Sequence, residues 1–325
     1  FVNSKAEGIK LQEKILASTD LIGTLGGLAA PLANTGAKVK PLRIVAEKAI
    51  GIHREASLPK FHRNSFSKLF NSRYEKTSSS EKNIRKVAFF PTCSINYNNP
   101  PVGIACVEVL RKNGCEVTVP PQECCGMPFL DSGDIKSALK KISANVKNLS
   151  VLIENGYDIL IPSPTCSYTI KYEYPKLLET EQSEVLSRHT FDISEYLWKL
   201  KTEGNLNTEF MNPSFGTKIQ KVAYHASCHL RAQFMGNKGA DLIGLIPGIQ
   251  VEQIENCSGH DGTWGFKKNT YPRSLQIGSK LFRGLEESKA DLFVTDCSLS
   301  SIQIEHVTGQ RAIHPLQVLD QAYRA

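Results

Sequence analysis

The sequence lacks several features that would assign a function directly. No run of about 18 apolar residues is free of charges and helix breakers, so no membrane-spanning helix is expected. The glycine-rich residues 23–27 (GTLGG) do not stand between a strand and a helix, which excludes a dinucleotide-binding fingerprint. No serine or cysteine has an evident base partner that would make it a nucleophile. We therefore predict no catalytic residue on this chain.

Positive charge is concentrated at one end of the chain. With 41% hydrophobic and 22% charged residues, the 325-residue sequence fits a globular protein of two domains. Residues 1–86 hold 16 Lys and Arg against 7 Asp and Glu, a balance of +9 in a chain of net charge +7. A basic arm beside a nearly neutral body favours an anionic membrane surface or an acidic partner over nucleic acid. A solvated arm, or one packed across the body, is the alternative.

The chain has nine cysteines, which is an odd number. Disulfide frameworks are typical of short secreted domains, whereas a cytoplasmic protein with this many thiols uses them for metal or redox chemistry. The positions of the cysteines must decide between these uses.

The cysteines belong to an internal repeat. Three blocks recur in order: residues 86–93 (KVAFFPTC) as 221–228 (KVAYHASC), 114–126 (GCEVTVPPQECCG) as 248–259 (GIQVEQIENCSG), and 157–166 (YDILIPSPTC) as 290–297 (ADLFVTDC). The cysteine offsets are 135, 133 and 131 residues. Three ordered blocks with slowly drifting offsets indicate two related halves.

Each half follows the order strand, helix, strand, turn, helix, strand. Strands are expected at residues 87–90, 117–119, 159–161 and 222–224, and helices at 102–112 and 135–154. This alternation predicts an α/β fold of two pseudo-repeated Rossmann-like halves with parallel sheets. We place the halves at residues 81–205 and 218–325, with linkers at 76–86 and 201–217. Residues 1–80 form the basic arm, in which residues 20–52 should contain one or two amphipathic helices broken near Pro31 and Pro41.

The repeated cysteines all follow predicted strands. Ligands of parallel sheets bind beyond the carboxyl ends of the strands, so Cys93, Cys124, Cys125 and Cys166 should converge there. Soft sulfur ligands suit iron–sulfur clusters and zinc. Adjacent cysteines are unusual for zinc, whose paired ligands are normally spaced by two to four residues. The pattern therefore favours an iron–sulfur cluster of the 4Fe–4S type, with zinc as the alternative.

The second half has a depleted set. It retains Cys228, Cys257 and Cys297, while Ser258 stands where the first half has a cysteine. Three thiolates can hold a second, more labile cluster if a further ligand completes it. His225, His229 and His260 lie within three residues of these cysteines, and His260, beside the turn, is the best candidate metal ligand. Alternatively, this half has lost its metal and become a docking or quinone-facing surface.

Three residues near these blocks are given structural roles. Cys106 lies on the apolar side of a predicted helix and Cys115 at a strand start, and neither recurs in the second half. His314, before Pro315, is expected to cap a helix.

The cysteine pattern resembles a known family, the cysteine-rich CCG-domain iron–sulfur proteins, a superfamily that includes the B component of heterodisulfide reductase. The likeness is strongest to the branch formed by the C components of anaerobic glycerol-3-phosphate dehydrogenases, and it covers nearly the whole chain. It is carried by the segments SLPKF (57–61), INYNNP (95–100), EYPKLL (173–178), GTWGFKKNTYPRSLQIGSKLF (262–282) and SKADLFVTDC (288–297).

The resemblance implies an electron-transfer subunit. Such proteins accept electrons from a flavoprotein dehydrogenase, acting on glycerol 3-phosphate or a 2-hydroxy acid, and pass them toward membrane quinone. They are peripherally attached to the inner face of the cell membrane, which the basic arm would contact. They also carry a ferredoxin-like part with Cys-x-x-Cys-x-x-Cys runs, which this sequence lacks. We expect that part to precede Phe1 or a ferredoxin-like protein to replace it.

The chain departs from the full family pattern, which closes with Cys-x-x-Cys. Thr169 and Ser300 occupy the closing positions, three residues after Cys166 and Cys297. Heterodisulfide or thiol-disulfide reduction, the enzymatic alternative, depends on the complete pattern, so its loss favours electron relay. A zinc-binding structural subunit is the remaining alternative.

Overall fold

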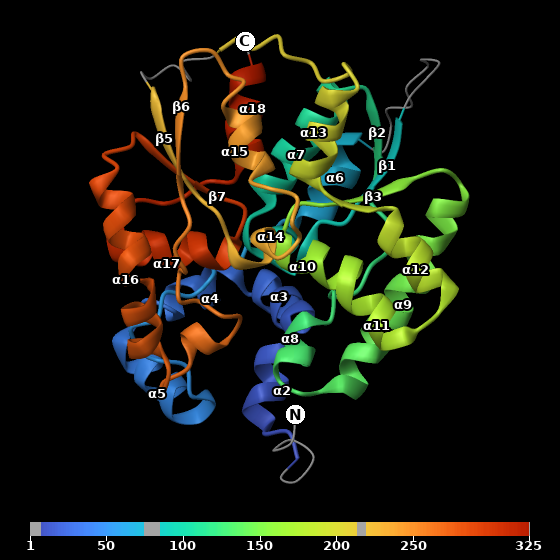
Figure 1. Ribbon diagram of the computed structural model, residues 1–325. Coiled ribbons are helices and arrows are strands. Elements are labelled where there is room, and N and C mark those ends of the chain that lie inside the picture. The colour runs from blue at the N-terminus through green and yellow to red at the C-terminus, as the bar shows by residue number, and fades with distance from the viewer. Residues whose placement is uncertain (1–7, 75–84, 213–218, 325) are drawn as a thin grey trace.

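Two parallel sheets lie side by side, and a helical arm covers one end of both (Figure 1). The computed structural model describes residues 8–74, 85–212 and 219–324. This arrangement confirms the predicted α/β class, the two related halves and the helical N-terminal region.

The first sheet contains four parallel strands in the order β2-β1-β3-β4. They are β1 (Arg85–Phe89), β2 (Cys115–Thr118), β3 (Asp158–Ile161) and β4 (Thr190–Asp192). The register sets Val87 of β1 opposite Val117 and Asp158 of its neighbours. The first three strands overlap the expected ranges. The fourth was missed, because three residues are too few to show strand periodicity.

The second sheet repeats the first three positions. Its strands are β5 (Lys221–His225), β6 (Gln250–Ile254) and β7 (Leu292–Thr295), all parallel, in the order β6-β5-β7. In each half the first strand is central, the second lies on one side and the third on the other. The sequence repeat is therefore also a repeat of topology.

Helices connect the strands in both halves. Those of the first half are α7 (Pro100–Lys112), α8 (Met127–Asp131), α9 (Ile135–Glu154), α10 (Pro164–Tyr168), α11 (Tyr174–Leu178), α12 (Glu181–Arg188) and α13 (Ile193–Thr202), with the π-helical turns η1 (Ser94–Asn98) and η2 (Thr169–Glu173). Those of the second half are α14 (Cys228–Arg231), α15 (Lys238–Ile243), α16 (Tyr271–Glu287), α17 (Ser298–Thr308) and α18 (Pro315–Tyr323), with the 3₁₀ turn η3 (Trp264–Phe266). The expected helices at 102–112 and 135–154 are confirmed as α7 and α9.

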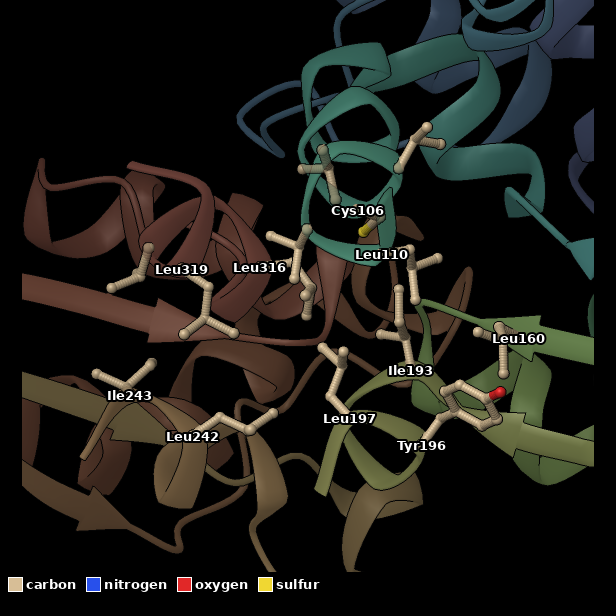
Figure 2. Packing of buried hydrophobic residues seen from close by; sticks show 14 of the residues in the cluster. Cys106, Leu110, Leu160, Ile193, Tyr196, Leu197, Leu242, Ile243, Leu316 and Leu319 are labelled. Carbon is tan, nitrogen blue, oxygen red and sulfur yellow. The ribbon is translucent and has the colours of Figure 1, made fainter. Parts of the chain in front are cut away.

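The two halves share one hydrophobic core. Side chains alternate along β1, so Val87 and Phe89 face this shared core while Ala88 and Phe90 face α9 on the other side. Helices α7 and α13 pack there against α18 and α15 (Figure 2). Cys106 is fully buried among these side chains, which is consistent with its predicted structural role. Each buried leucine contributes about 1.5–3 kcal/mol, so the halves stabilise each other.

The arm forms more helices than expected. Its elements are α2 (Leu11–Ala17), α3 (Thr19–Leu28), α4 (Ala30–Gly36), α5 (Lys40–Ile50) and α6 (Phe66–Tyr74). Pro31 and Pro41 stand in the first turns of α4 and α5, where proline fits a helix without losing a hydrogen bond. Three of these helices, α3, α4 and α5, cover residues 20–52, so the expectation of one or two helices there is wrong, although the breaks fall where predicted. Most of the linker at 76–86, and part of that at 201–217, lies outside the described residues.

The arm is attached to both halves. Asp20 pairs with Lys141 of α9 at 2.6 Å, and Glu13 pairs with Lys267 of the second half at 2.7 Å. Ile52 forms a backbone bridge with Lys267. The arm therefore packs across both halves, which was one of the alternatives open from the sequence. Within the described residues, no helix combines the length and apolar character needed to cross a membrane.

Candidate functional site

Four thiols meet at the carboxyl edge of the first sheet. Cys93 follows β1, Cys124 and Cys125 follow β2, and Cys166 lies in α10 after β3. We call these four residues the first set. Gly126 has φ +93°, a left-handed conformation that lets the loop turn directly after the adjacent cysteines. The convergence predicted from the strand ends is thus present in the fold.

The thiols of the first set form a continuous row. Cys124 is in hydrogen-bond contact with Cys93 and Cys125, and Cys125 is also in contact with Cys166. The pKa of Cys124 is lowered because Cys125 and Cys93 donate hydrogen bonds to its sulfur. The same hydrogen bonds, together with burial, raise the pKa of Cys93 and Cys125. The centre of the row therefore favours a thiolate, the form that ligates metals.

A buried polar network holds the loop of adjacent cysteines. Asn145 of α9 donates to the carbonyl of Cys124 at 3.1 Å and accepts from the backbone N–H of Glu123 at 2.8 Å. The Tyr174 hydroxyl donates to the carbonyl of Cys125 at 3.0 Å. Neither supporting residue was predicted from the sequence. The available signal was a polar Asn145 on the apolar stripe of an amphipathic helix.

Backbone strain and the arm also act on the first set. Thr92, just before Cys93, has φ +64°, which costs a β-branched residue about 1–3 kcal/mol. The hydroxyl of Thr19 in α3 lies 3.4 Å from the sulfur of Cys124. The arm therefore contacts one of the sulfurs of the site.

The second set consists of Cys228, Cys257 and Cys297. Cys228 and Cys257 are exposed and Cys297 is half-buried. Partial burial and the nearby sulfurs of Cys257 and Cys297 raise the pKa of Cys228, so the three thiols are neighbours. This set is more accessible to solvent than the first, in which Cys124 and Cys125 are buried.

Two serines replace the missing cysteines of the second half. Ser258 follows Cys257, and Ser300 lies three residues after Cys297. The Ser300 hydroxyl donates to that of Ser258 at 3.0 Å, and both residues are buried. Gln303 donates to the carbonyl of Ser258 at 2.6 Å and so fixes this turn. A hydroxyl pair thus occupies positions that carry thiolates in the full family pattern.

The three histidines near the second set have different environments. Both ring nitrogens of His225 are used, one 3.0 Å from the Thr295 hydroxyl and the other 3.1 Å from the Asn256 carbonyl. His260 is buried, and its ring nitrogens have no hydrogen-bond partner among the described residues. Its ring packs edge to face against the Phe266 ring, with 4.3 Å between the ring centroids. Burial lowers the pKa of His260 to about 4. The role of His260 as a metal ligand stays a prediction.

A short hydrogen-bonded bridge connects the two sets. Thr165, next to Cys166, lies 3.1 Å from Nδ1 of His229, which is next to Cys228. The bridge joins α10 to α14, which lie together at the centre of Figure 1. A contact between the halves therefore joins a residue next to Cys166 to one next to Cys228.

The donor chemistry of the first set fits an iron–sulfur cluster. It offers four sulfur ligands from three strand ends. These pack beside the apolar side chains between the first sheet and α9. In the described part of the chain, no group of three or more Cys, His, Asp or Glu side chains has the spacing to hold a single metal ion. The sulfurs form a row of contacts instead, which makes this row the candidate cofactor site of the first half.

Comparison with known proteins gives consistent matches. The model of the cysteine-rich domain CCG matches residues 87–171 and 222–305. The C component of anaerobic glycerol-3-phosphate dehydrogenase from Escherichia coli is 34% identical over 315 residues, covering 96% of this chain and 77% of that protein. The B component of the fumarate reductase (CoM/CoB) from Methanothermobacter marburgensis is 27% identical over 248 residues, 73% of this chain and 46% of that protein. Lactate utilization protein A from Halalkalibacterium halodurans is 30% identical over 224 residues, 65% of this chain and 85% of that protein.

Proposed function

The chain belongs to the family of CCG cysteine-rich domain proteins, and we propose that it is an iron–sulfur electron-transfer subunit of a respiratory dehydrogenase. Similarity to the dehydrogenase component and to lactate utilization protein A supports such a role. In this proposal the chain receives electrons from a flavoprotein partner and passes them toward membrane quinone. Glycerol 3-phosphate is the first candidate substrate of the partner, and a 2-hydroxy acid is the second.

The row of four thiols is the observation that carries this proposal. Cys93, Cys124, Cys125 and Cys166 would hold the first cluster, which would supply one-electron oxidation and reduction without breaking substrate bonds. The second set would hold a more labile cluster, since it offers three thiols and is more exposed. The domain division at 1–80, 81–205 and 218–325 belongs to the same proposal.

The surrounding residues hold the backbone of the loop that carries the adjacent cysteines. Asn145 and Tyr174 fix the carbonyls of the loop, so the adjacent sulfurs face the strand ends in one orientation. Thr19 places the arm over Cys124 and provides a hydroxyl next to its sulfur. Hydrogen bonds to sulfur and solvent exposure are two of the features that set a cluster's reduction potential.

An iron and sulfide count on anaerobically prepared protein tests the proposal. We expect about four iron and four acid-labile sulfide per filled set, with an electron spin resonance signal after reduction by dithionite. The first set should stay filled longer than the second in the presence of a chelator. A colourless protein that contains zinc and no sulfide would contradict the proposal.

The outer face of the arm supports a membrane location. Large apolar side chains are exposed on α2 to α5, namely Leu11, Ile15, Leu21, Leu25, Leu28, Leu32, Leu42, Ile44 and Val45. Lysines at positions 10, 14, 38, 40 and 48 accompany them. Apolar residues beside lysines suit the interface of an anionic bilayer. We propose that this face attaches the chain peripherally to the inner face of the cell membrane.

Replacing Leu25, Leu28 and Leu32 by serine should weaken vesicle binding at least tenfold. These side chains are 57%, 72% and 80% exposed, so their loss should remove membrane contact and leave the core intact. Flotation with vesicles of phosphatidylglycerol and phosphatidylethanolamine measures the effect. A matched control replaces exposed apolar residues of the body, Val151, Ile277 and Val307, by serine. Equal flotation of the arm variant and this control would contradict the proposed attachment of the arm to the membrane.

A further inference from the structure

A cavity of about 490 Å³ opens beside the first set, between the arm and the first half. Its wall includes α3, the start of α6, η1 and the loop that leads from β2 to Cys124. Cys93 and Cys124 are among the lining residues. A volume between about 300 and 1,000 Å³ is usual for small-molecule sites. The cavity therefore gives a small ligand access to half of the first set.

One side of the cavity continues into the exposed apolar face of the arm. Helix α3 turns Gly23 toward the first half, where a β-carbon would collide with the Tyr97 ring, and Gly27 toward the carbonyl of His62 in the arm. Its opposite side carries the exposed Leu21 and Leu25. Leu28 belongs to both surfaces, because it lines the cavity and is 72% exposed. An apolar chain could therefore pass from the cavity to the face proposed to lie on the membrane.

The wall of the cavity also carries positive charge. Arg63 and Lys68 line it, and within the described residues neither side chain makes an ion pair. The two carboxylates of the lining, Asp20 and Glu123, are both paired with Lys141, at 2.6 and 2.5 Å. The free charges of the cavity are thus cationic hydrogen-bond donors. They suit a ligand whose oxygens accept hydrogen bonds.

We propose that this cavity binds the head group of a membrane quinone. A quinone combines a flat apolar ring, two carbonyl oxygens for Arg63 and Lys68, and a tail that would leave past Leu28 into the lipid. A small anion would use the cations and leave the apolar exit without a role. The inference rests on the proposed function and adds to it the place where the acceptor binds.

Photolabelling locates the site on the unmodified chain. An azidoquinone with a short alkyl tail is the probe, and labelled peptides are identified by mass spectrometry. We expect label in residues 20–28 and 92–97, which excess decylubiquinone should suppress. Label confined to other peptides, or label that decylubiquinone does not suppress, overturns the inference. Suppression by inorganic phosphate at millimolar concentration also overturns it, because that marks an anion site.

A pair of lysine variants tests the role of charge in the cavity. Lys68→Ala should weaken binding of decylubiquinone about tenfold, because a charge-assisted hydrogen bond to a carbonyl oxygen is lost. Lys60→Ala is the matched control, since Lys60 is close in sequence and does not line the cavity. Equal weakening in both variants would leave only a general charge effect and contradict the inference.

Iron and sulfide contents of the same preparations separate this inference from the proposed function. A protein with normal iron and sulfide that is labelled away from the cavity overturns only the quinone site and leaves the proposed iron–sulfur role in place. A protein without iron and sulfide overturns the proposed function instead. In that case, label in residues 20–28 and 92–97 that decylubiquinone suppresses would still support a quinone site.

Discussion

Cys125→Ser should make the iron and sulfide of the first set, about four of each per chain, as easily lost to a chelator as those proposed for the second set. The substitution gives the first half the Cys-Ser-Gly sequence that the second half already has at Cys257. Oxygen is a harder ligand than sulfur and holds cluster iron less well. Cys125 also contacts Cys124 and Cys166, so its loss interrupts the row of thiols. The effect should therefore be far larger than removal of one ligand at the end of the row.

Iron, sulfide and the electron spin resonance signal measure this loss in anaerobic preparations. Cys106→Ala is the control, because Cys106 is fully buried in the core shared by the two halves and should leave the metal content unchanged. Circular dichroism confirms that both variants are folded. If Cys125→Ser keeps its iron and sulfide in the presence of a chelator for as long as the unmodified chain does, the first set is not the cluster site.

The reciprocal substitution, Ser258→Cys, should strengthen the second set. Ser258 is buried beside Ser300, with their hydroxyls 3.0 Å apart, so a new sulfur there would lie at the turn after Cys257. A fourth thiol should slow the loss of iron to a chelator in the second half. An unchanged rate of iron loss to the chelator would indicate that the serine pair belongs to a half that no longer holds metal.

Much of the fold could be predicted because its signals are local. The repeated blocks place β1, β3, β5 and β7 directly, since each is a short run of apolar β-formers before a cysteine. The alternation of strands with α7 and α9 then requires parallel sheets. Strand β4 gave no such signal, because it has three residues and is recognisable only from its pairing with β3.

The candidate site was less predictable, because it depends on contacts between distant segments. The cysteines could be grouped by the strand ends that they follow. That Thr19 of the arm would reach Cys124, 105 residues away, has no local signature. The hydrogen bond between Ser258 and Ser300 likewise appears only when the turn and α17 are folded together. Sequence therefore indicates which residues can serve as ligands, whereas folding decides what covers and supports them.

The second large effect concerns acid stability and His314. Its Nε2–H donates to the carbonyl of Pro162 at 2.9 Å, while Nδ1 accepts from the backbone N–H of Leu316 at 3.2 Å. His314 caps α18, as predicted from its place before Pro315. Burial lowers its pKa from 6.5 to about 4. A proton on Nδ1 would face the Leu316 N–H, so the fold keeps this imidazole neutral.

The pH dependence follows from the direction of this shift. Between pH 6.5 and 4 the unfolded chain binds a proton at His314 that the folded chain does not bind, because the pKa is lower in the folded state. The stabilisation is therefore complete above pH 6.5 and is lost as the pH falls toward 4, up to about 3 kcal/mol of unfolding free energy. Urea unfolding at pH 7 and at pH 4.5 measures this loss.

His314→Asn should remove this part of the pH dependence. Asparagine is a good helix cap, so α18 keeps an acceptor at its start, while the titrating group is gone. The variant should be less stable than the natural chain at pH 7, because the hydrogen bond to Pro162 is lost. Its stability should nevertheless fall less between pH 7 and pH 4.5. His189→Asn is the control, because His189 is exposed and lies outside the core. If the two variants show the same pH dependence, burial of His314 does not contribute to acid sensitivity.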